Sequence, residues 1–178
     1  MKAPKSMQLY RGHISAGEEI VIRDVPWMRE DFLVDYLNYL DEIFGPNIDV
    51  LEFDSGSSTP YIAKRVRSLV SYERNKIWYE VVSERLKIDG IKNTTLHFDP
   101  HYHSTFCGTE SQFDIVINDI WHSWVCLKRL VLIGMERVHP GGLLIFHSHI
   151  LEEKLQREGW EVVKKWGDYW KVVWRKPN

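Results

Sequence analysis

The sequence predicts an α/β fold of three layers, in which helices cover both faces of a mostly parallel sheet that ends in an antiparallel hairpin. Short apolar runs alternate with amphipathic helical segments from about residue 28 to residue 158, which is the pattern of repeated βαβ units. Two further strand-like segments, 160–163 and 170–174, are separated by a short turn at Gly167-Asp168. Strands so close in sequence can pair only antiparallel.

The first helix precedes the first central strand. Apolar residues recur at spacings of three and four between residues 28 and 44, and Gly45-Pro46 ends the pattern. Residues 50–53 form a short apolar strand. A helix is expected from Thr59 to about Arg67, with Pro60 in its first turn, where proline is tolerated.

Two more strands and a capped helix follow. Residues 68–72 form the second strand, and residues 94–98 form the third. Between them, Asn75 can cap a helix that Gly90 can close. Residues 113–117 are almost all apolar, which is typical of a strand buried on both faces of a parallel sheet.

The last βα units lead to the hairpin. A helix over residues 121–138 and a turn at 140–142 precede a buried strand at 143–146. A short helix over 151–158 then joins this strand to the hairpin.

The composition is that of an ordinary folded domain. The chain has 178 residues, of which 44% are hydrophobic and 27% are charged. No apolar run is long enough to span a bilayer, and no apolar stretch of signal-peptide length follows the basic first residues. Cys107 and Cys126 lie in segments of different predicted type, so we expect reduced thiols and a cytoplasmic location. The net charge of -2 gives no global basic surface for nucleic acid, although it leaves a local one open.

The loop after the first central strand has the features of a ligand site. A tight turn of small residues follows this strand, and the second strand ends on Glu73 about 20 residues later, as in a βαβ nucleotide-binding unit. The loop offers backbone N–H groups and hydroxyl donors, and Gly56 permits close approach to the backbone. A carboxylate at the Glu73 position can accept hydrogen bonds from the hydroxyls of a ribose. These features predict an adenosine-type cofactor at the carboxyl ends of the strands.

Four stretches resemble the motifs of the class I methyltransferases that use S-adenosyl-L-methionine. They are Val50-Leu-Glu-Phe-Asp-Ser-Gly-Ser-Ser-Thr59, Val70-Ser-Tyr-Glu-Arg-Asn75, Phe113-Asp-Ile-Val-Ile-Asn-Asp119 and Pro140-Gly-Gly-Leu-Leu-Ile145. The resemblance extends over about residues 48 to 176 and is closest to small bacterial and archaeal members. It implies a Rossmann-like methyltransferase fold and transfer of a methyl group by in-line displacement.

The resemblance also implies roles for individual residues. The cofactor would be held by Glu52, Asp54, Ser55, Gly56, Ser57 and Ser58 at its methionine part, by Glu73 at its ribose and by Asp99 at its adenine, with Arg74 as a further cofactor-binding residue. Asp119, with His122 or His147, would face the acceptor as the catalytic residues.

Two departures from the family pattern bear on function. Asp54 stands where the family has its first loop glycine, and Asp tolerates a positive φ better than most residues. Asp54 is therefore either a working part of the loop or the mark of a degenerate protein that keeps the fold and binds a partner. His147-Ser148-His149 stands where related metal-dependent O-methyltransferases carry Asp-Asn, so no magnesium site is expected.

Histidines gather near the ends of the predicted strands. They are His97, His101, His103, His122, His147 and His149. In an extended segment, His97, Asp99, His101 and His103 would share one face. Three interpretations stay open: scattered surface histidines, a general base, or the transition-metal site of a hydrolase.

Aromatic and basic residues complete the expectations. Trp121, Trp124, Trp166 and Trp170 flank the site and could stack on a substrate, whereas Trp78, Trp160 and Trp174 are expected to pack in the core or at the sheet edge. The basic residues near the chain end, Lys164, Lys165, Lys171, Arg175 and Lys176, fit either a phosphate contact or a solubilising edge strand.

We expect a single domain over residues 1–178. Residues 1–47 would form an N-terminal extension and helix, and residues 48–178 the cofactor-binding core. The first 27 residues would cover the site or form the contact of a homo-oligomer. The methyl acceptor is open between a small molecule, a protein and RNA, and no membrane partner is expected.

Overall fold

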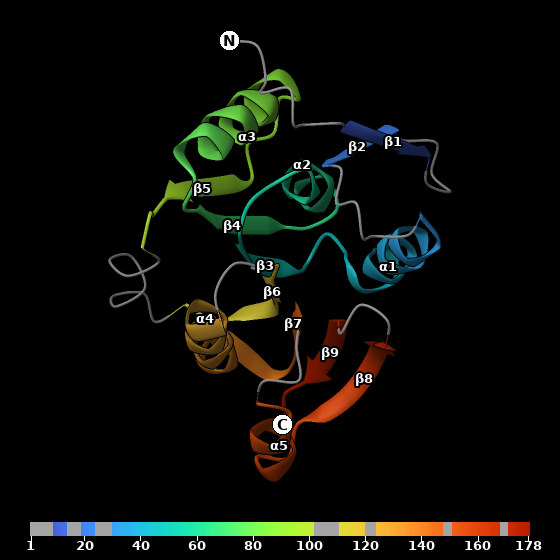
Figure 1. Ribbon diagram of the computed structural model, residues 1–178, viewed down its shortest axis with the longest axis vertical. Coiled ribbons are helices and arrows are strands. Elements are labelled where there is room, and N and C mark those ends of the chain that lie inside the picture. Colours follow the sequence, from blue (N-terminus) through green and yellow to red (C-terminus); the bar gives the residue numbers. More distant parts are fainter. Residues whose placement is uncertain are drawn as a thin grey trace.

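A seven-stranded sheet forms the centre of the molecule, in the strand order β5-β4-β3-β6-β7-β9-β8 (Figure 1). The computed structural model describes residues 9–13, 19–23, 30–101, 111–119, 124–147, 151–167 and 171–178. A separate two-stranded sheet pairs β1 (Leu9–His13) with β2 (Glu19–Arg23) antiparallel. Within the described residues, no helix is both long and apolar enough to cross a membrane.

The rest of the described chain consists of helices and strands that alternate for the most part. In order they are α1 (Glu30–Ile43), β3 (Asp49–Phe53), α2 (Ser58–Ala63), β4 (Ser68–Glu73), α3 (Lys76–Ile88), β5 (Thr94–Phe98), β6 (Phe113–Asn118), α4 (Trp124–Arg137), β7 (Val138–His147), α5 (Glu152–Arg157), β8 (Glu161–Trp166) and β9 (Lys171–Arg175). Strands β3 to β7 pair parallel, and β9 pairs antiparallel with both β7 and β8. The predicted parallel sheet with an antiparallel C-terminal hairpin is therefore confirmed.

Helices cover both faces of the sheet, which confirms the three layers (Figure 1). On one face, α1 and α2 pack through Leu40 and Ile62 against a layer that includes Val50 of β3. On the other face, α4 and α5 pack through Leu130 and Leu155 against strand residues such as Val116. Trp160 and Trp174 are buried in this second layer, as predicted, and Trp78 is half-buried.

The caps of α3 are those that the sequence predicts. The Asn75 side chain accepts hydrogen bonds from the N–H groups of Ile77 and Trp78, at 3.0 and 3.3 Å. Gly90 follows the helix with a φ of +66°, a conformation in which a side chain would be strained.

Helix α2 ends at Ala63, before the predicted end at Arg67. Asn93, which precedes β5, donates its side-chain amide to the carbonyl groups of Ala63 and Val66, at 2.8 and 2.9 Å. Arg67 forms an ion pair with Asp49 at the start of β3. These contacts satisfy the carbonyl groups at the end of α2 and lead the chain into β4.

The turn predicted at residues 140–142 is wrong, because β7 begins at Val138 and runs through it. A side chain at Gly142 would place its Cβ 2.7 Å from the carbonyl oxygen of Asp114. Gly142 therefore allows β7 to lie directly against β6, and the pairing of these strands shifts register between Phe113 and Ile115.

Candidate functional site at the carboxyl edge of the sheet

Buried polar side chains gather at one edge of the sheet. Among the described residues, those with buried polar or charged side chains are Glu52, Ser55, Thr59, Ser71, Glu73, Asp99, Asn118, His147 and Lys171. Each belongs to the carboxyl-terminal part of a parallel strand, to the loop or the first helical turn that follows it, or to the start of the antiparallel β9. Burying polar groups is costly, so this concentration at the edge where α/β folds bind ligands makes it the candidate functional site.

Glu52 holds the start of α2 against the sheet. Its Oε1 accepts a hydrogen bond from the Ser58 hydroxyl at 2.7 Å, and its Oε2 accepts from the hydroxyls of Thr59 and Ser71, both at 2.7 Å. Burial raises the pKa of Glu52 to about 7, although the three hydroxyl donors oppose this rise. The predicted contact of Glu52 with the methionine part of a cofactor stays a prediction.

The loop after β3 has a left-handed backbone conformation at Asp54, the residue that stands at the glycine position of the family pattern. Asp54 has a φ of +74°, the left-handed region that glycine adopts most easily. The N–H groups of Asp54 and Ser55 both donate to the carbonyl oxygen of Tyr72, at 2.9 and 3.3 Å. The loop is therefore tied to the end of β4.

Gly56 leaves open space beside the loop. The Gly56 N–H donates to the Thr59 hydroxyl at 2.9 Å, so the backbone conformation is fixed by α2. A Cβ at Gly56 would meet no protein atom within 4 Å. This position fits the close approach of a ligand to the backbone, as a cofactor in this loop requires.

Glu73 and Asp99 lie side by side at the ends of β4 and β5. Glu73 accepts hydrogen bonds from the Ser55 hydroxyl at 3.0 Å and from the Asn75 N–H at 2.6 Å. The Asp99 N–H donates to the Glu73 carbonyl at 2.8 Å. Burial, with a smaller effect of the Asp54 charge, raises the pKa of Glu73 to about 7. Each carboxylate oxygen can accept more than one hydrogen bond, so Glu73 keeps capacity for a ligand hydroxyl.

A buried charged cluster occupies the other half of the same edge. Asp119 follows β6, His147 ends β7, and Lys171 begins β9, where it is the register partner of His147. The Lys171 ammonium donates to Asp119 Oδ1, and its Nζ lies 3.2 Å from His147 Nε2. The structure thus brings together two of the predicted catalytic residues, Asp119 and His147, whereas His122 lies outside the described residues.

Lys171 is a member of the site that the sequence analysis missed. The sequence left Lys171 open between a phosphate contact and a solubilising edge strand, but β8 forms the edge of the sheet and β9 lies inside it. The side chain of Lys171 is 1% exposed. The signal that could have identified it is its position directly before Val172-Val173-Trp174, an apolar run typical of a strand buried on both faces.

The described histidines do not share one face. His97 lies within β5, where its ring stacks on Tyr72 with a centroid distance of 4.7 Å. The strand ends at Phe98, and Asp99 accepts a hydrogen bond from the His101 N–H in a turn. The expected alternation of His97, Asp99 and His101 is therefore wrong. No group of three or more metal-binding side chains is found within the described residues; His103 and His149 are outside them.

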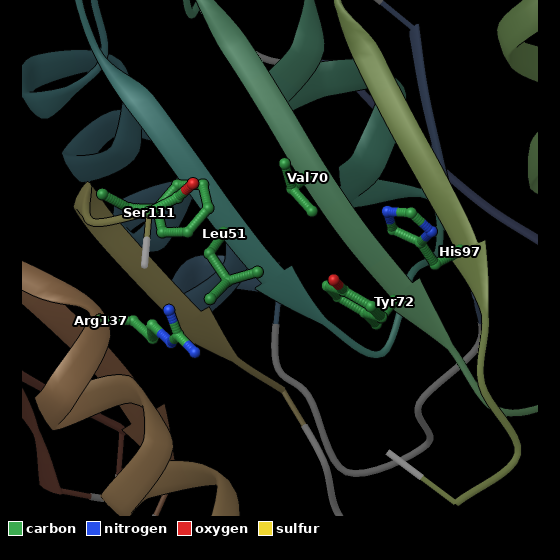
Figure 2. Close-up of a pocket in the computed structure, with 7 residues that line it drawn as sticks. Leu51, Val70, Tyr72, His97, Ser111 and Arg137 are labelled. Atoms are coloured by element: carbon green, nitrogen blue, oxygen red, sulfur yellow. The ribbon is translucent and has the colours of Figure 1, made fainter. Parts of the chain in front are cut away.

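A cavity of about 110 Å³ lies on the face of the sheet rather than at its edge (Figure 2). Leu51, Val70 and His97 line it from three neighbouring strands, and Arg137 lines it from the end of α4. No residue of the loop at 54–58 lines this cavity, and no cofactor is assigned to it.

Trp166 lies in the core, contrary to the expectation that it could stack on a substrate. It is packed edge-on against the rings of Tyr36 and Tyr39 of α1, at centroid distances of 5.6 and 5.5 Å. Trp121, Trp170 and the side chain of Trp124 lie outside the part of the chain that the structure describes.

The fold is a Rossmann-like α/β fold of the methyltransferase type, as the strand order and the helices on both faces of the sheet indicate. Several solved structures have the same fold. An rRNA methylase from Streptococcus thermophilus superposes with a TM-score of 0.63 and 16% identity, covering 85% of this chain and 99% of that chain. A T. thermophilus 16S rRNA N2 G1207 methyltransferase, solved with AdoMet and guanosine, gives a TM-score of 0.68 and 16% identity over 98% of this chain and 52% of its own.

A third similar structure is TYW2 of M. jannaschii in complex with AdoMet (S-adenosylmethionine), with a TM-score of 0.61 and 15% identity over 98% of this chain and 87% of that chain. Comparison of the sequence finds no matching family model and no matching curated protein. The similarity therefore establishes the fold, and it confirms the fold that the motif resemblance implied.

Proposed function

We propose that this chain is an S-adenosylmethionine-dependent methyltransferase with its cofactor at the carboxyl edge of β3, β4 and β5. The observation that carries the proposal is the gathering of buried polar side chains at this edge, around a loop with open space at Gly56. The similar structures solved with AdoMet support the same cofactor.

The residues at the carboxyl edge of β3, β4 and β5, the cofactor half of the site, would bind the cofactor through hydrogen bonds and through the shape of the loop. Glu73 would accept hydrogen bonds from ribose hydroxyls, with Arg74 beside it, and Asp99 would accept from the adenine amino group. The loop from Asp54 to Ser58 would face the methionine part, because Gly56 leaves the backbone accessible there. Glu52 would support this loop through Ser58 and Thr59.

The cluster of Asp119, His147 and Lys171 forms the acceptor half of the site. Its residues would orient the nucleophile of the methyl acceptor. The bound cofactor supplies a methyl group already activated by its sulfonium, so the protein need not form a covalent bond to it. Alignment of the acceptor and placement of its proton supply the remaining catalysis. We assign this task to Asp119 and His147, which lie together at the ends of β6 and β7.

For the acceptor we propose RNA. Two of the similar structures are described as methyltransferases of ribosomal RNA, which supports this choice. The test is transfer of a labelled methyl group from S-adenosylmethionine to total cellular RNA, with protein extract and a small-metabolite fraction as parallel acceptors. Labelled methyl groups in RNA would support the proposal. Labelled methyl groups found only in the protein or the metabolite fraction would contradict it and identify that fraction as the source of the acceptor.

Cofactor binding is tested by calorimetry with S-adenosylmethionine and S-adenosylhomocysteine. We expect both to bind the wild type, and Gly56→Ala to weaken binding at least about tenfold, because the added methyl group would fill the space left for the ligand. Gly45→Ala is the matched control, since its Cβ would make only an ordinary contact with Ile48 at 3.9 Å. No binding by the wild type at millimolar concentrations would contradict the proposed function.

A further inference from the structure

Lys171 is a buried cation on an inner strand. It begins β9, which lies between β7 and β8, and it is almost completely shielded from water. An ammonium group in such a place must exchange its hydration for protein partners, because an unpaired buried charge is strongly unfavourable.

Three partners surround the Lys171 ammonium, which has three N–H donors and no acceptor. It donates to Asp119 Oδ1 and lies 3.2 Å from His147 Nε2. It also lies 3.9 Å from the centroid of the Tyr36 ring on α1, within the range of a cation–π interaction. The three partners come from three different elements, so the ammonium is held from β6, β7 and α1 at once.

The contact with His147 specifies how its imidazole is protonated. An ammonium can only donate, so Nε2 must present its lone pair to Lys171. The proton of a neutral imidazole is then on Nδ1. Although Nε2 is also 3.3 Å from Asp119 Oδ1, an Nε2–H pointing there would place two donors 3.2 Å apart. With its lone pair engaged, Nε2 does not act as a general base.

The contact with Asp119 leaves one carboxylate oxygen available. Oδ1 faces Lys171, whereas Oδ2 has no hydrogen-bond partner within the described part of the chain. The Asp119 side chain is 25% exposed, so the group is accessible from the carboxyl edge. Burial alone would raise the pKa of Asp119, but the Lys171 ammonium beside it holds this pKa well below its usual range.

We propose that Lys171 is a positioning residue of the acceptor half of the site: its ammonium fixes Asp119 as a carboxylate with Oδ2 left for an acceptor, and fixes His147 as the tautomer protonated on Nδ1. The inference rests on the proposed function, because only a methyl acceptor gives Asp119 a group to orient. Within the part of the chain that the structure describes, Tyr36 of α1 and Glu52 of β3 are the other ionisable groups that influence this cluster.

The experiment is nuclear magnetic resonance of the ligand-free protein. Long-range ¹⁵N–¹H spectra at pH 7 are expected to show His147 protonated on Nδ1, with Nε2 as an acceptor. The ¹³C signal of the Asp119 carboxyl group is expected to stay constant above pH 4. In Lys171→Met, the Asp119 midpoint should rise by roughly two pH units, because the opposite charge beside it is gone.

Lys165→Met is the matched control, since Lys165 lies on the edge strand β8 and is 39% exposed. It should leave both signals unchanged. An Nε2–H signal for His147 in the wild type, or an Asp119 curve that is the same in Lys171→Met, would overturn the proposal. If Lys171→Met does not fold, the wild-type His147 signal alone decides. Failure of cofactor binding in calorimetry would instead count against the proposed function, so the two failures are distinguishable.

Discussion

Asp54 combines an unfavourable backbone conformation with an unfavourable charge. Its φ of +74° lies in the region that costs a non-glycine residue roughly 1 kcal/mol or more. Its carboxylate also contributes to raising the pKa of Glu73. Leu151, before α5, has the same φ, so the conformation alone does not mark a ligand site; at Asp54 it coincides with the buried polar side chains of the loop.

Replacing Asp54 with glycine should therefore stabilise the ligand-free protein. We expect Asp54→Gly to increase the free energy of unfolding by about 1 kcal/mol, measured in urea, because the backbone cost disappears. The pKa of Glu73 should fall in the same variant.

Asp54→Asn separates the two effects, since it removes the charge and keeps a side chain at positive φ. It should lower the pKa of Glu73 as much as glycine does but give a smaller gain in stability. Equal stability of the wild type and Asp54→Gly would show that the loop is not strained at this residue.

At this same scale, spacing along the chain predicts part of the site. Glu73, Asp99 and Asp119 follow predicted strands directly, so parallel pairing alone brings them to one edge. Lys171 could not be placed in this way, because its burial depends on β9 entering the sheet between β7 and β8. Side-chain hydrogen bonds such as that between Ser71 and Glu52 depend on strand register, which no local pattern specifies.

At the scale of elements, helix α2 is held by a contact from outside its own sequence. Local preference alone predicts a helix to Arg67, but the Asn93 amide binds the carbonyl groups of Ala63 and Val66 and ends the helix earlier. The backbone carbonyl of Asn93 also accepts a hydrogen bond from the Leu69 N–H at the start of β4, at 2.9 Å. Asn93 is distant from the site but supports the loop and helix that form it.

Asn93→Ala should destabilise the protein by about 2 kcal/mol, because two buried carbonyl groups lose their donor. Lys92→Ala, at the exposed neighbouring position, should change stability by less than about 0.5 kcal/mol. Urea denaturation measures both. If Asn93→Ala lowered the free energy of unfolding no more than Lys92→Ala does, the Asn93 amide would not be what ends α2.

Strongly patterned elements could be predicted from sequence, and elements shaped by distant contacts could not. Helix α3 has its cap at Asn75 and its closing glycine at Gly90 as predicted, because both signals are local. Strand β7 starts earlier than predicted. Gly141 and Gly142 are typical of a turn in sequence, and only the structure shows that Gly142 lies in close contact with Asp114 of β6.

At the scale of the whole molecule, buried carboxyl groups link folding to pH. Burial raises the pKa of both Glu52 and Glu73 from 4.5 to about 7. The folded protein therefore binds these protons more tightly than the unfolded chain does. The stability that these groups contribute is fully present below about pH 4.5 and is lost as the pH rises through 7.

We therefore expect the ligand-free protein to unfold at a lower temperature at pH 8 than at pH 5. Each group accounts for about 3 kcal/mol across this range, at 1.36 kcal/mol per pKa unit. Glu52→Gln should remove roughly half of the pH dependence while it keeps the size of the side chain. Thermal unfolding followed by circular dichroism measures the effect, and a wild type equally stable at both pH values would contradict it.

The central claim is that the carboxyl edge of β3, β4 and β5 binds S-adenosylmethionine or its product. Titration of ¹⁵N-labelled protein with S-adenosylhomocysteine, followed in ¹⁵N–¹H spectra, tests binding and location together. The account predicts that the amide signals of Asp54 to Ser58, Glu73, Arg74 and Asp99 shift first and furthest, while those of α5 stay constant. Absence of shifts at millimolar ligand, or shifts confined to residues away from this edge, would contradict it.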